Sequence, residues 1–199
     1  MRLSVIRPVI AVALATALTG CFNSVDPVSE MYGATMGSTY SIKWVPVDDA
    51  PDTEALQADI DGMLARFDAE VSTWRSDSTL AQFNAAPAGT CMDMPESVLT
   101  MMEQSDRLSA ESDGAFDVTV APLLKLWGFH GDPQLQTVPD QELLEQAMAQ
   151  VGQQHLHIDD GQLCKDVPLT VDFSSIGAGY MVDRVAERLE HYGIKSYMV

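Results

Sequence analysis

Two polar segments combine residue types that could bind a ligand containing a ring. Residues 33–40 join two glycines and several hydroxyl side chains around Met36. Such a backbone can approach a ligand closely, and a methionine offers an adaptable apolar surface. Residues 72–78 carry one large aromatic side chain, Trp74, which could stack on a heterocycle. On composition alone, the first segment is more often simply the entry to a strand, and Trp74 could equally be a core residue.

Two further segments could bind charged groups. Residues 114–129 are apolar and aromatic but include Asp117. A buried carboxylate there needs partners such as backbone amides, a hydroxyl or a ligand. Residues 172–180 read Asp-Phe-Ser-Ser-Ile-Gly-Ala-Gly-Tyr and lead into a predicted helix, whose first N–H groups are a natural seat for a diphosphate. The glycine spacing is not that of a Rossmann fingerprint, and the P-loop lysine is missing.

The N-terminal segment predicts export. Arg2 and Arg7 precede an apolar run at residues 9–18. This run of about ten residues is too short to span a membrane and is typical of a signal peptide. It ends in Leu18-Thr19-Gly20-Cys21, which resembles the bacterial lipobox; the alternative is an ordinary signal peptide followed by a chance cysteine.

We therefore expect a lipoprotein of the bacterial cell envelope that faces the periplasm. In this interpretation residues 1–20 are the signal peptide, Cys21 carries the lipid and residues 21–31 form a polar tether.

The net charge of −18 argues against nucleic acid as a partner. Removing residues 1–20 takes away two arginines and no acid, so the remainder is more acidic still. An acidic domain is not attracted to anionic lipid, so membrane attachment should depend on the lipid anchor alone. Cys91 and Cys164 would then lie in a compartment that permits disulfides. They could pair, or remain as two buried thiols.

Hydrophobic periodicity predicts the elements that position these segments. Apolar residues three and four apart predict a helix from Thr53 through Val71, and alternation predicts a strand at residues 39–45. The other expected elements are a short helical turn at 80–83, helices at 95–110, 139–151 and 182–191, a hairpin through Ile158, Leu163 and residues 169–173, and a strand beginning at 195. This mixture predicts an α+β fold.

The amino-acid sequences of the four segments, and their order along the chain, resemble those of the ApbE family of FAD:protein FMN transferases, from residue 33 to the end of the chain. The third segment is the most specific, because Gly-Ala-Phe-Asp-Val-Thr is followed by Pro122, Trp127 and Phe129 at the family's offsets. The resemblance implies an ApbE-like, T-fold-like mixed β-sheet with packed helices over residues 32–199. The family's further metal ligands and a catalytic segment are expected beyond Val199, so we expect this domain to be incomplete, truncated at its C-terminus and inactive alone.

The resemblance also implies a site. It assigns contacts with FAD to seven positions: Met36, Trp74, Ala115, Phe116, Asp117, Asp172 and Ala178. Trp74 stands where the family usually has Tyr, and Ala178 where many members have Lys, so only a backbone approach is expected at 178. The Ser175 backbone carbonyl is expected to bind Mg²⁺.

The reaction implied is transfer of FMN from FAD to a Thr or Ser hydroxyl of a target protein, with release of AMP and dependence on Mg²⁺. The expected acceptors are flavin-carrying subunits of membrane redox complexes of the Nqr and Rnf type. Two alternatives remain open: a non-catalytic lipoprotein that binds FAD or slowly hydrolyses it, and a solute-binding lipoprotein without flavin.

Overall fold

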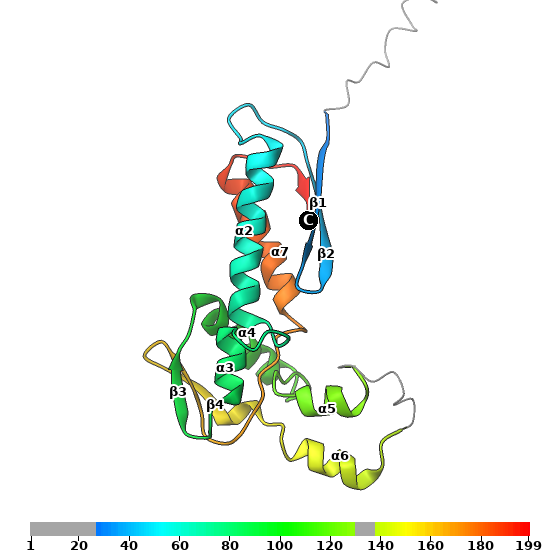
Figure 1. The fold of residues 1–199 in the computed structure, drawn as a ribbon, viewed down its shortest axis with the longest axis vertical. Helices are drawn as coiled ribbons and strands as arrows, with labels where there is room; N and C mark the ends of the chain where they lie inside the picture. The colour runs from blue at the N-terminus through cyan, green and yellow to red at the C-terminus, as the bar shows by residue number, and fades with distance from the viewer. Residues whose placement is uncertain (1–26, 130–137) are drawn as a thin grey trace, which may run out of the picture.

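The computed structural model describes residues 27–129 and 138–199. The predicted signal peptide, the lipidation at Cys21 and most of the predicted tether lie outside the described residues. Within them, the α+β prediction is confirmed: helices pack against two three-stranded sheets, and every strand pair is antiparallel. Figure 1 shows one sheet at the upper end and the other at the lower end.

The first sheet has the order β1-β2-β6 and contains the predicted strand. β1 (Ser29–Thr35) pairs with β2 (Ser38–Trp44) along its whole length, and β6 (Tyr197–Met198) pairs with the far end of β2. The prediction of a tether through residue 31 was wrong at its end, because residues 29–31 belong to β1. Met31 is only 2% exposed, so burial of this side chain fixes the strand there.

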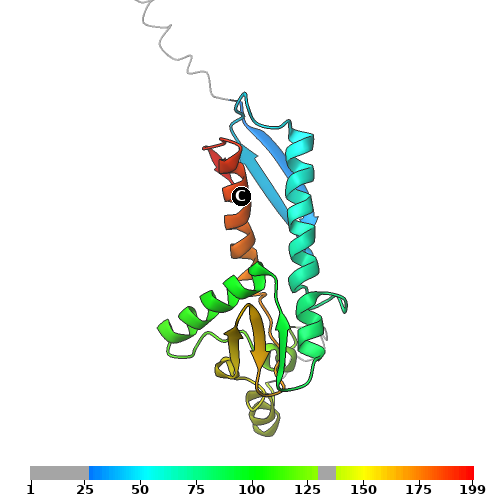
Figure 2. The ribbon, with the colours of Figure 1, turned by 90° about the vertical axis from the view of Figure 1, so that its left-hand side faces the viewer.

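Two long helices run side by side in opposite directions next to this sheet (Figures 1 and 2). α2 (Thr53–Val71) is confirmed as predicted; the Asp52 side chain caps it by accepting a hydrogen bond from the Ala55 N–H at 2.8 Å. α7 (Gly177–His191) begins five residues before the predicted start. Its buried residues recur every four positions, at Gly177, Met181, Val185 and Leu189.

The second sheet has the order β3-β5-β4 and contains the predicted β4-β5 hairpin. Its strands are β3 (Thr90–Asp93), β4 (Leu156–Asp159) and β5 (Gln162–Lys165). Cys91 and Cys164 lie opposite each other in the β3-β5 register and form a disulfide. The sequence left open whether these two cysteines pair, and the structure shows that they do.

Residues 169–173 do not form the predicted strand. Leu169, Val171 and Phe173 are buried as an alternating pattern requires, but the backbone of Val171 is hydrogen-bonded by the side chain of Asn84. An amide side chain thus replaces the neighbouring strand that the pattern had indicated.

The remaining helices surround the second sheet and extend away from it (Figure 1). α4 (Glu96–Glu111) matches its prediction closely; α3 (Thr79–Ala85) is longer than expected, and α6 (Gln141–Met148) is shorter. α5 (Ala121–Leu126), which lies inside the segment 114–129, was not predicted, and a short 3-10 helix spans Gln153–His155. No helix in the described part of the chain has both the length and the apolar character needed to cross a membrane.

Candidate ligand-binding site

A cavity of about 560 Å³ opens where three elements come together. These elements are the turn of the β1-β2 hairpin, the C-terminal end of α2 and the first turns of α7. All three lie near the middle of the view in Figure 1. The wall is mainly apolar, and its charged side chains are Asp68, Arg75 and Asp172. The volume falls within the range of about 300–1,000 Å³ typical of small-molecule and cofactor sites.

The hairpin turn places Met36 in the cavity wall. Thr35 pairs with Ser38, so Met36 and Gly37 form a two-residue loop, with positive φ angles of 48° and 71°. Such loops favour Asn-Gly, and a methionine is unusual at a positive φ. Gly37 is therefore required by the turn, which needs a positive φ. Met36 reaches the cavity wall at some cost in backbone strain.

The segment after α2 forms the rim of the cavity. Trp74 is 77% exposed there, so it is not the core residue that the sequence allowed as an alternative. The Arg75 guanidinium makes two hydrogen bonds of 3.0 Å to the Asp77 carboxylate and lies 3.6 Å from Asp68. These contacts lower the pKa of Asp77 and raise that of Arg75. The rim thus presents an aromatic face beside a cation that two carboxylates hold in place.

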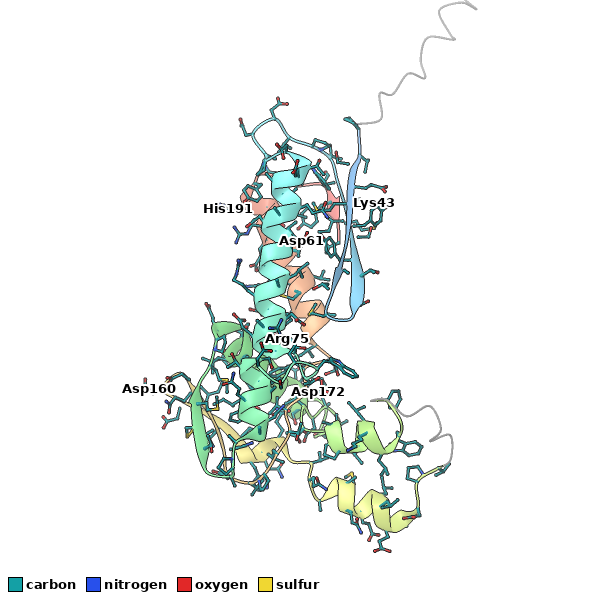
Figure 3. All side chains as sticks on the ribbon, viewed as in Figure 1. Lys43, Asp61, Arg75, Asp160, Asp172 and His191 are labelled. Atoms are coloured by element: carbon teal, nitrogen blue, oxygen red, sulfur yellow. A yellow bond between two sulfur atoms is a disulfide. The ribbon has the colours of Figure 1, made fainter. Side chains whose placement is uncertain are left out.

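Asp172, which is labelled in Figure 3, contributes a buried carboxylate to the cavity wall. It is only 5% exposed. Its Oδ1 accepts a hydrogen bond of 2.7 Å from the Ser174 N–H, and its own N–H donates to the Val118 carbonyl at 2.8 Å. Ala178, the second residue of α7, also lines the cavity. Met36, Trp74, Asp172 and Ala178, four of the seven positions at which the resemblance implies FAD contacts, therefore line one cavity.

Ala115, Phe116 and Asp117 do not line this cavity. The Asp117 carboxylate instead organises its own segment: it accepts hydrogen bonds from the Thr119 N–H at 2.6 Å, the Thr119 hydroxyl at 2.5 Å and the Gln153 N–H at 3.0 Å. The expected need for amide and hydroxyl partners is met in this way. Residues 114–129 are connected to the cavity only indirectly in this region, through the hydrogen bond from the Asp172 N–H to the Val118 carbonyl.

The described residues offer little to a metal ion. Ser175 lies in the turn that leads into α7, and its carbonyl is an oxygen ligand of the kind that Mg²⁺ accepts. Among residues 27–129 and 138–199, no group of three or more His, Cys, Asp or Glu side chains could hold a metal. These residues fit one side of a magnesium site at most.

Several lining residues were not singled out by the sequence analysis as ligand contacts. Leu64, Phe67 and Val71 of α2 line the cavity together with Met181 and Val185 of α7. Their helical spacing indicates a core face, and nothing in that pattern reveals that these residues also border a cavity.

Tyr40 was also missed, although it belongs to the first segment. Its hydroxyl donates to Asp61 Oδ1 at 2.6 Å, and its ring packs over Gly33 of the neighbouring strand. Burial, followed by the hydrogen bond to Asp61, raises the pKa of Tyr40 to about 12. The phenol therefore stays neutral in the cavity wall over the physiological range.

Comparison with known proteins gives a consistent result. The sequence model of the ApbE family matches residues 36–199. An FAD:protein FMN transferase of Vibrio cholerae is 38% identical over 191 residues, which are 96% of this chain and 57% of that protein. The apo crystal structure of the flavinyl transferase ApbE of Pseudomonas stutzeri aligns with a TM-score of 0.80 and 48% identity, over 86% of this chain and 56% of that one. The flavin transferase ApbE of Vibrio cholerae aligns with a TM-score of 0.82, over 86% and 56% of the two chains, at 38% identity.

Proposed function

The chain belongs to the ApbE family, and we propose that it serves the reaction named for its relatives, the transfer of FMN from FAD to a target protein. The chain spans 57% of the length of the curated Vibrio cholerae relative. The observation that carries the proposal is the cavity itself, because Met36, Trp74, Asp172 and Ala178 come from three distant segments and line one hollow. Those are four of the seven positions at which the family resemblance implies FAD contacts.

The chemistry of the wall suits a flavin nucleotide. Met36, Phe67 and Val71 offer an apolar surface to a ring system, and the Asp172 carboxylate can accept a hydrogen bond from a nucleotide hydroxyl. The Gly177 N–H donates to the Phe173 carbonyl at 2.7 Å, but Ala178 in the first turn of α7 also lines the cavity, and a diphosphate bound there would be stabilised by the helix N-terminus.

The proposed reaction is a phosphoryl-type transfer. The oxygen of a Thr or Ser hydroxyl in the target forms a bond with the FMN-side phosphorus of FAD and gives up its proton to a base or to water. The bond from that phosphorus to the bridging oxygen breaks, and AMP leaves with that oxygen. Mg²⁺ would neutralise charge on the diphosphate, and the carbonyl of Ser175 would be one of its ligands. The cavity residues bind and orient the donor, so that its diphosphate lies where an acceptor hydroxyl can approach.

We also propose that the protein is a lipoprotein anchored through Cys21 and facing the periplasm, where it would modify subunits of Nqr- or Rnf-type redox complexes. Support comes from the signal-like residues 1–18 and the lipobox-like residues 18–21. Anchoring enzyme and acceptor to one envelope raises their effective concentration for each other.

The proposal is tested by incubating the full-length protein with FAD, Mg²⁺ and a flavin-acceptor domain, and then determining the mass of the acceptor. An acceptor that gains the mass of FMN supports the transferase. FMN and AMP released without an adduct would favour the alternative of an FAD-hydrolysing lipoprotein, and no affinity for FAD would favour a solute-binding protein. An Asp172→Ala variant should bind FAD much more weakly than the wild type; unchanged affinity would remove Asp172 from the site.

A further inference from the structure

We propose that Asn84 is a positioning residue for this site: its side-chain amide fixes the backbone at Val171 and thereby holds the Asp172 carboxylate in the cavity wall. Asn84 lies outside the cavity, near the end of α3. The inference rests on the proposed function, because it takes Asp172 as a contact of FAD.

The contact between Asn84 and Val171 uses both polar groups of each partner. The Val171 N–H donates to Asn84 Oδ1 at 2.8 Å, and Asn84 Nδ2 donates to the Val171 carbonyl at 2.9 Å. A neighbouring antiparallel strand would supply the same pair of bonds. Val171 is fully buried, so a missing partner for either backbone group would be costly.

These bonds fix one peptide group from both sides. The Val171 carbonyl and the Asp172 N–H belong to the same planar unit. Asn84 holds the carbonyl, while the Asp172 N–H donates to the Val118 carbonyl at 2.8 Å. Because this plane is held at both ends, the Cα–Cβ bond of Asp172 has a defined direction, and with it the carboxylate is directed to the cavity wall.

Asn84 is itself held in place. The Lys165 ammonium donates to the carbonyls of Phe83 at 2.7 Å and of Asn84 at 3.1 Å, at the last turn of α3. At the other end of the helix, the Ser78 hydroxyl accepts from the Ala81 N–H and donates to the Ser72 carbonyl at 2.6 Å. The helix is therefore fixed at both ends. It links Ser72, which lines the cavity, to Val171, the residue before Asp172.

The test compares three variants of the full-length protein by their affinity for FAD. Asn84→Leu keeps the size of the side chain and removes both bonds, whereas Asn84→Asp keeps the acceptor for the Val171 N–H but cannot donate to the carbonyl. Gln82→Leu is the matched control, because it removes an exposed amide from the same helix whose bond goes to the Asp77 carbonyl. Each lost bond weakens the fixed geometry, and we expect Asn84→Leu to raise the dissociation constant for FAD about 10-fold. Asn84→Asp should fall between Asn84→Leu and the wild type, and Gln82→Leu should match the wild type.

The route through Asp172 is tested by a double-mutant cycle. If Asn84 acts by positioning Asp172, then Asn84→Leu has no further effect on FAD affinity in an Asp172→Ala background. Equal fold-changes in both backgrounds would overturn the proposal, as would an Asn84→Leu protein that binds FAD like the wild type. A fold destabilised without specific positioning would weaken FAD binding in both backgrounds alike.

Amide hydrogen exchange separates this inference from the proposed function. Faster exchange of the Val171 and Ser174 N–H groups in Asn84→Leu, but not in Gln82→Leu, supports positioning whether or not the protein binds FAD. Unchanged exchange at both amides overturns it. If the wild-type protein binds no FAD, or if Asp172→Ala leaves the affinity unchanged, the proposed site is wrong and the exchange result alone decides on Asn84.

Discussion

Replacing Lys165 with methionine should destabilise the fold substantially, because this ammonium is buried among carbonyls. Lys165 is only 1% exposed, and its Nζ donates to Phe83 at 2.7 Å, Asn84 at 3.1 Å and Leu169 at 3.5 Å. Hydrogen bonds to a charged group contribute about 1.5–3 kcal/mol each, and the two shorter bonds dominate. Burial lowers the pKa of Lys165, so removing the charge also recovers part of its cost of desolvation. We expect a net loss of about 2–3 kcal/mol in the free energy of unfolding.

Urea denaturation of the full-length protein measures this change. Lys43→Met is the control, because Lys43 is partly exposed and pairs with Glu30 on the surface at 2.7 Å. Exposed pairs contribute little, so the control should unfold at nearly the same urea concentration as the wild type. A Lys165→Met protein as stable as the wild type, or more stable, would refute the reasoning. It would show that desolvation of the ammonium outweighs its bonds to the helix end.

Three further predictions concern the hairpin, the cavity wall and the disulfide. Because the raised pKa of Tyr40 means that the folded state binds the phenolic proton more tightly, the free energy of unfolding should fall as pH rises from 10.0 to about 12. Tyr40→Phe should flatten this fall in alkaline denaturation curves, and an unchanged slope would count against it. In Gly33→Ala, the new Cβ would lie 2.6 Å from Tyr40 Cζ, so the ring must move; ultraviolet titration should show the Tyr40 pKa returning toward 10.0, and an unaltered titration would contradict this packing. Replacing Cys91 and Cys164 together by serine opens a loop with a sequence separation of 73, which costs up to about 4 kcal/mol by loop-closure entropy; equal denaturant midpoints with and without the disulfide would contradict this.

The elements that could be predicted from the sequence are those with a long, regular pattern. α2 shows this best, since its apolar residues repeat over 19 residues and Asp52 marks its start. β1 was missed because its burial depends on Met31, a single strongly buried residue between two exposed neighbours. The buried alternation of residues 169–173 predicted a strand, but the partner of Val171 is an amide side chain, which no periodicity reveals.

The site was predicted in part, and for a different reason. Met36, Trp74, Asp172 and Ala178 come together because the hairpin turn, the C-terminal end of α2 and the start of α7 meet at one place. That convergence follows from tertiary packing, and only the family resemblance connected the four residues beforehand. Asp117 was correctly expected to need amide and hydroxyl partners, yet Thr119 and Gln153 supply them away from the cavity. Its predicted contact with FAD stays a prediction.

The central claim is that this cavity binds FAD for transfer of FMN, and the most direct measurement counts both products of one reaction. The full-length protein, FAD, Mg²⁺ and an acceptor domain are incubated together, and AMP and flavinylated acceptor are quantified in the same sample. We predict equal amounts of the two products with the wild type, and neither product with Asp172→Ala. AMP formed without flavinylated acceptor, or full transfer by Asp172→Ala, would contradict the account.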